Sequence, residues 1–171
     1  MDRLERFGDA LSNIVMWGAV ITGFLMMVHV AIDVIARNLF NAPLFGTIEI
    51  GSNYYMVAIS YLPLAWIIKN EGHIIVELFT RKMSKAAVFK LDTYVAIVTF
   101  VYVSVIAFMG FENAIEQTEI FEQAESAWGF IAVWPARWLV VIGFGCFAIQ
   151  ALIQIFVAFV RMKNSVGAQE Q

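Results

Sequence analysis

Long apolar runs separated by short polar segments dominate the pattern of hydrophobic and polar positions along the chain. Four runs, at residues 14–36, 48–68, 91–111 and 134–160, each hold few charged residues. A helix needs about 20 apolar residues to cross a hydrocarbon core that is roughly 30 Å thick. The pattern therefore predicts an all-α integral membrane protein, with four transmembrane helices in a single membrane domain over residues 1–171.

Composition supports a membrane protein. Hydrophobic residues make up 61% of the chain, whereas a soluble domain is about 45–50% apolar. The first apolar run is longer than the core of a secretory signal and lacks a clear small-residue cleavage site, so we expect it to be retained as a helix. Four spans leave no room for a second, soluble domain.

The segment between the second and third spans has a different pattern. Over residues 73–87, apolar side chains recur at helical spacing, and charged side chains take the opposite face. Such a segment is too charged to span and too apolar to remain in water. We expect an amphipathic helix that lies in the headgroup region, where anionic lipid would attract its lysines.

The distribution of positive charge predicts the orientation. If there are four spans, nine of the 11 Lys and Arg residues fall on one side: Arg3, Arg6, Lys69, Arg81, Lys82, Lys85, Lys90, Arg161 and Lys163. Only Arg37 and Arg137 fall on the other side. Positive residues favour the cytoplasmic side, so both termini are predicted to be cytoplasmic, in an N-in, C-in arrangement.

Three polar residues near the end of the first span share one helix face at a spacing of four: His29, Asp33 and Arg37. One interpretation is a proton relay or an ion site, because polar groups in a membrane are costly and usually functional. The other is a helix-end ladder, in which Asp33 pairs with Arg37 and His29 donates to Asp33. The spacing favours the ladder. Glu49 begins the second span and is a candidate to pair with Arg37 or to contact a substrate.

Two glutamines on the fourth span and a row of glutamates after the third are the remaining candidates. Gln150 and Gln154 are four residues apart, and each can bond between helices or face a partner protein. The segment 112–127 is acidic and is either a solvated helix or loop, or a docking site for a basic periplasmic partner. Its glutamates are Glu112, Glu116, Glu119, Glu122 and Glu125.

The sequence holds no pattern that predicts catalysis. It has no cluster with metal-ligand spacing, no nucleophile beside a base and no phosphate-binding loop. Cys146 is the single cysteine, and we interpret it as a small packing residue. The two histidines, His29 and His73, fall at opposite membrane sides and cannot share one haem. No enzyme activity, cofactor or nucleic acid is expected. An autonomous proton-coupled exporter and a membrane anchor of a redox complex remain as alternatives.

Two stretches, RNLFNAPLFGTIEIG and KNEGHIIVELF, resemble the small membrane subunit (the Q subunit) of tripartite ATP-independent periplasmic (TRAP) transporters. An arginine leaves the first span, and a short connection leads to a glutamate that opens the second. A histidine, a valine and an acidic residue then follow the second span, and Trp and Pro open the last. These residues are Arg37, Asn41, Pro43, Gly46, Glu49, His73, Val76, Glu77, Trp134 and Pro135.

The resemblance implies a permease subunit in the inner membrane of a bacterium. A periplasmic protein would capture an organic acid, of the sialic acid or C4-dicarboxylate class. A separate large membrane subunit would hold the substrate and sodium sites and move as an elevator, so this subunit itself would bind no metal. The small subunit would be a scaffold for the large one and help to dock the binding protein. Asp33, Arg37, Glu49, His73, Glu77, Gln150 and Gln154 are then candidates for structural or inter-subunit contacts.

Overall fold

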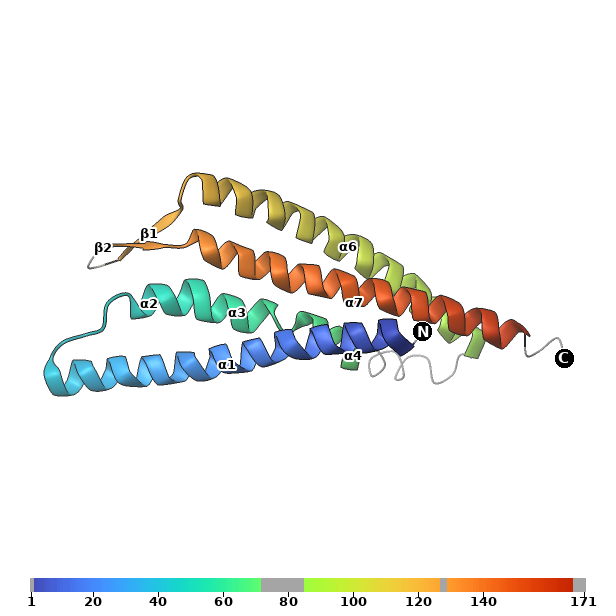
Figure 1. Ribbon diagram of the computed structural model, residues 1–171, viewed down its shortest axis with the longest axis horizontal. Coiled ribbons are helices and arrows are strands. Elements are labelled where there is room, and N and C mark those ends of the chain that lie inside the picture. Colours follow the sequence, from blue (N-terminus) through green and yellow to red (C-terminus); the bar gives the residue numbers. More distant parts are fainter. Residues whose placement is uncertain (1, 72–84, 127–128, 168–171) are drawn as a thin grey trace.

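Three long helices lie side by side with one broken helical segment (Figure 1). The protein is described by a computed structural model, in which residues 2–71, 85–126 and 129–167 are placed. The long helices are α1 (Asp2–Phe40), α6 (Lys85–Glu119) and α7 (Trp134–Gly167). Each contains a stretch long and apolar enough to cross a membrane: Arg6–Phe40, Thr93–Glu119 and Trp134–Val157. Three of the four predicted spans are therefore continuous helices.

The second predicted span is not one continuous helix. It is built from α2 (Thr47–Ile50), the π-helical turn η1 (Gly51–Tyr55), α3 (Met56–Tyr61) and α4 (Leu64–Glu71). The break between α3 and α4 falls at Pro63, which has no backbone N–H and clashes with the preceding turn of a helix. The helix begins again in α4, where the backbone N–H groups of Trp66 and Ile67 both donate to the carbonyl of Pro63.

The acidic segment after the third span differs from the all-α expectation. Its first part continues α6 as far as Glu119. The chain then leaves the helix through Phe121, which has a φ of 49°. It forms strand β1 (Gln123–Ser126), which pairs antiparallel with β2 (Gly129–Ala132). We call this pair the ribbon. Strands of four residues are too short to show a clear alternation of apolar and polar side chains, so the sequence pattern did not predict the ribbon.

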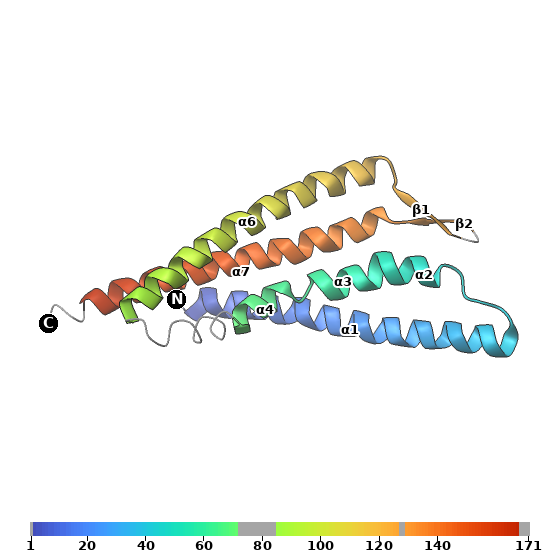
Figure 2. The same cartoon turned by 180° about the vertical axis from the view of Figure 1, so that it is seen from behind.

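Over the outer part of the molecule the four helical elements form a layer in the order α6, α7, α2–α4, α1, and α6 crosses α7 toward the other end (Figures 1 and 2). α6 packs along α7, α7 packs on α3 and α4, and α1 packs on α3, α4 and part of α7. α1 begins and α7 ends at one end of the layer, which we call the inner end. The α1–α2 connection and the ribbon lie at the opposite end, which we call the outer end.

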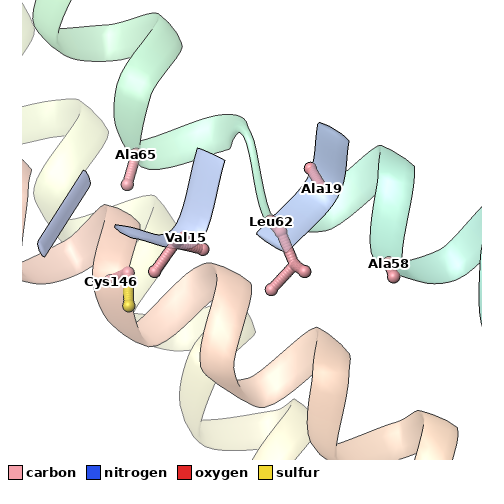
Figure 3. Close-up of a cluster of buried hydrophobic side chains, with 6 residues drawn as sticks. All are labelled: Val15, Ala19, Ala58, Leu62, Ala65 and Cys146. Atoms are coloured by element: carbon pink, nitrogen blue, oxygen red, sulfur yellow. The ribbon is translucent and has the colours of Figure 1, made fainter. Parts of the chain in front are cut away.

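Small side chains hold the middle of the layer together. Val15, Ala19, Ala58, Leu62, Ala65 and Cys146 form a buried apolar cluster that joins α1, α3, α4 and α7 (Figure 3). Cys146 is buried in this cluster, in agreement with its interpretation as a packing residue. The closest approach is at Gly143 of α7, where an added Cβ would lie 2.5 Å from the carbonyl oxygen of Tyr61. Only glycine permits that approach.

The predicted interfacial helix at 73–87 lies almost entirely outside the described residues, and so do His73 and Glu77. Residues 85–87 belong to the first turn of α6. The orientation of the termini relative to the cytoplasm stays a prediction.

Candidate functional site

A buried carboxylate organises the outer end of α1. Asp33 is 5% exposed and accepts two hydrogen bonds, from Arg37 Nη2 at 3.0 Å and from the backbone N–H of Leu44 at 2.8 Å. Arg37 lies one helical turn further along, so the spacing of four brings the two charges together. The ladder interpretation is right for this pair. The bond to Leu44 fastens the α1–α2 connection to α1.

The connection turns sharply and packs against the ribbon. Asn41 and Gly46 have φ angles of 52° and 66°, in the left-handed region that Asn and Gly tolerate best. A Cβ at Gly46 would collide with Ile131 of β2. Tyr54 in η1 donates to the carbonyl of Ala132 at 2.6 Å, which ties the ribbon to the second span as well.

Glu49 does not pair with Arg37 in this structure. The guanidinium of Arg37 is bonded to Asp33, and no ion pair joins Arg37 to Glu49, although both side chains are described. The backbone carbonyl of Glu49 accepts from Asn53 at 2.9 Å and from Ser52 at 3.3 Å. Asn53 thus bonds back to the backbone one turn earlier.

His29 bonds across to the second span instead of along its own helix. Its Nδ1 lies 3.1 Å from the hydroxyl of Tyr55. The two rings meet edge to face, with centroids 5.7 Å apart. The step in the ladder from His29 to Asp33 is therefore replaced by a contact between helices. Because Tyr55 is 26 residues away in sequence, local spacing gave no sign of it.

Three polar contacts fasten the inner end, and we call them the inner clasp. Ser12 Oγ donates to Gln150 Oε1 at 3.4 Å, and both residues are buried. Gln154 Nε2 donates to the carbonyl oxygen of Ile68 at 2.8 Å. Lys69 Nζ lies 2.9 Å from Asp9 Oδ1. Both glutamines therefore bond between helices, the first of the two roles predicted for them.

An ion pair between Arg137 and Glu122 closes the base of the ribbon. Arg137 donates to Glu122 through both Nη2, at 2.7 Å, and Nε, at 3.0 Å. The bonds from Arg137 hold the pKa of Glu122 below its ordinary value, against the opposing effect of partial burial. The carbonyl of Glu122 also accepts from the N–H of Val133 at 2.8 Å. One residue thus joins the two ends of the ribbon to each other.

The other glutamates of the acidic segment are free of such bonds. The side chains of Glu112, Glu116, Glu119 and Glu125 are exposed and make none of the ion pairs found in the described part of the chain. Of the five predicted docking residues, Glu122 is therefore held within the fold and four face outward.

Beside them, α6 is fastened to α7 by Trp138, whose Nε1 donates to Thr118 Oγ1 at 3.1 Å. The ring of Trp138 also meets Phe111 edge to face, with centroids 5.9 Å apart.

Within residues 2–71, 85–126 and 129–167, no group of three or more His, Cys, Asp and Glu residues could hold a metal ion.

Together, the apolar helices and the polar contacts between them define a multi-pass helical membrane protein. The sequence profile of the tripartite ATP-independent periplasmic transporters, DctQ component, matches residues 26–161. The chain belongs to this family, so the resemblance found in its motifs is confirmed. It is a family of transporter components and not of enzymes. No curated protein and no solved structure gives a significant match.

Proposed function

We propose that this chain is the scaffold subunit of a sodium-driven transporter for an organic acid, of the sialic acid or C4-dicarboxylate class. It packs against a separate large membrane subunit, which holds the substrate and sodium sites and moves as an elevator. It lies in the inner membrane of a bacterium, and its outer end helps to receive the periplasmic binding protein.

The observation that carries the scaffold role is the way in which its polar groups are used. Asp33, His29, Gln150 and Gln154 each bond to another part of this chain. These contacts fix the helices and the connection relative to one another. A subunit whose intramembrane polar groups hold its own fold is suited to remain still while a partner moves.

The layout of the layer supports four crossings. α1 begins and α7 ends at the same end of the layer, which requires an even number of crossings. The segment Thr47–Glu71 runs back along α1, as the pairs His29–Tyr55 and Asp9–Lys69 show. With the three continuous helices α1, α6 and α7, this broken segment makes the fourth crossing. The excess of Lys and Arg then favours the cytoplasm for the inner end.

Partner contacts follow from what the layer leaves exposed. Large apolar side chains cover the outward faces of α1 and α6, where a membrane subunit or lipid can pack. At the outer end, the free carboxylates of Glu112, Glu116, Glu119 and Glu125 form an acidic surface for a basic patch of the binding protein. Steering by such a surface acts mainly on the association rate and weakens with salt.

The test of the scaffold role is a pull-down of the tagged chain from its native membrane in mild detergent, followed by mass spectrometry. We expect one larger, many-span membrane protein in stoichiometric amount. Recovery of the chain alone in several detergents would refute the proposal.

Docking is tested separately by replacing Glu112, Glu116 and Glu119 with Gln. We expect slower association of the binding protein with the reconstituted complex at low salt. A matched control is Gln117→Glu, which adds a carboxylate to the same stretch of α6 and should not slow association. Equal rates for the triple variant and the unmodified chain would contradict the docking role.

A further inference from the structure

The first two spans share one apolar zone. His29 contacts Tyr55, Gly18 faces Leu62, and α1 and α2–α4 run antiparallel along each other. At these pairings the run 14–36 of α1 lies alongside the run 48–68, so both are apolar over the same length of the layer. We call α1 with α2–α4 the first hairpin, and α6 with α7 the second hairpin.

The apolar zone of the second hairpin lies further toward the inner end. Gly143 of α7 touches Tyr61, the neighbour of Leu62, so it is level with about residue 19 of α1. Trp138 is five residues further out, and it contacts Phe111 and Thr118 of α6. Trp138 is therefore level with about residue 24 of α1 and with a point midway between Phe111 and Thr118 of α6. Residue 111, where the apolar run of α6 ends, is about four residues nearer the inner end, near the level of residue 20 of α1. α1 remains apolar for about 16 residues more, or roughly 24 Å.

An upright layer cannot accommodate this displacement in one bilayer. If the membrane were centred on the second hairpin, the outer half of α1 would stand beyond it. That half carries large apolar side chains: Phe24, Leu25, Met27, Ile32 and Ile35 are 60%, 50%, 61%, 49% and 53% exposed. The helices are also long for upright spans. α1, α6 and α7 have 39, 35 and 34 residues, or roughly 50–60 Å against a full bilayer of about 40–45 Å.

We propose that the layer crosses the membrane obliquely, inclined within its own plane, and that lipid hydrocarbon covers the outer half of α1. The displacement is that between α6 and α1, which are three helix spacings apart in the layer, or roughly 24–30 Å. A displacement of roughly 24 Å over that distance corresponds to an inclination of about 40–45°, beyond the mean of about 20° for membrane helices. At this inclination Arg37 and Glu112 reach the same membrane surface. The inclination follows from the chain alone and does not depend on what the transporter carries.

Spin labels at two exposed positions test the inclination. Leu25 and Val101, 50% and 56% exposed, lie roughly 24 Å apart along the helix axes. Each is replaced by Cys for labelling, in a chain with the buried Cys146 changed to Ala. The full chain is placed in vesicles of phosphatidylethanolamine and phosphatidylglycerol, without a partner. Collision with oxygen and with a nickel chelate gives the depth of each label, and labels at Val105 and Met109 calibrate depth along α6.

Both labels are expected at the bilayer centre, with maximal oxygen and minimal nickel collision. In any upright placement at least one label is roughly 12 Å or more from the centre, so a depth that far from the centre for either label would overturn the proposal. A water-exposed label at Leu25 would also overturn it, because lipid would then not cover the outer half of α1. The unlabelled chain gives a second measurement, by polarised infrared spectroscopy of aligned bilayers. A mean helix tilt near 45° is expected, and one near 20° would equally overturn the inclination.

Discussion

The contact between Gly143 and Tyr61 makes a sharp prediction about stability. A Cβ at Gly143 would lie 2.5, 2.8 and 2.9 Å from the carbonyl oxygen, carbonyl carbon and Cβ of Tyr61. Two of these atoms are backbone and cannot rotate away. Gly143→Ala must therefore move α7 away from α3, next to the cluster that joins the two hairpins.

Gly145 is a matched control on the same helix. A Cβ at that position would meet no atom within 4 Å. Both substitutions replace Gly by Ala inside α7, so each gains about 1 kcal/mol of helix propensity. This gain cancels when the two variants are compared. What remains is the overpacking at Gly143, about 1–3 kcal/mol for one methyl group forced into a packed site.

The assay is reversible unfolding of both variants in mixed micelles of dodecylmaltoside with increasing SDS, followed by circular dichroism. We expect Gly143→Ala to unfold about 1–3 kcal/mol more easily than Gly145→Ala, and Gly145→Ala to be at least as stable as the unmodified chain. Equal stability of the two variants would refute the close approach of α7 to the carbonyl of Tyr61.

Three further predictions concern the polar contacts. Arg137 lowers the pKa of Glu122, so the stability contributed by this carboxyl is present above its unfolded pKa and is lost as pH falls through the lowered folded value; Glu122→Gln should flatten the acid limb of a melting-temperature profile. Asp33→Ala, which removes the acceptor, should speed amide hydrogen exchange at Leu44, and unchanged exchange would contradict the bond between them. Gln154→Leu should cost about 0.6–1.7 kcal/mol in the SDS titration, and no cost would argue against its bond to α4.

The apolar runs predicted the helices well because membrane insertion depends on length and hydropathy, which the sequence states directly. The ion pair of Asp33 and Arg37 was also predictable, since spacing within one helix fixes the geometry. The family followed from short motifs around the first connection, and the sequence profile confirmed it.

Contacts between distant segments could not be read in the same way. Asp33 bonds to a backbone N–H at Leu44, and every residue except proline carries such a donor, so nothing in the sequence distinguishes this one. Glu122 and Arg137 are 15 residues apart and meet only because the chain between them folds into the ribbon. The apolar run 48–68 predicted one helix, whereas the helix breaks at Pro63.

The two tyrosines of η1 have a mechanical consequence. Tyr55 contacts His29 in α1, while its neighbour Tyr54 bonds to Ala132 in the ribbon. Since Glu122 anchors the other strand of the ribbon to α7 through Arg137, a push on the ribbon is divided between the two hairpins. A ribbon attached to both hairpins should bend less than one attached to a single helix. A force on the ribbon at the outer end would then move both hairpins together.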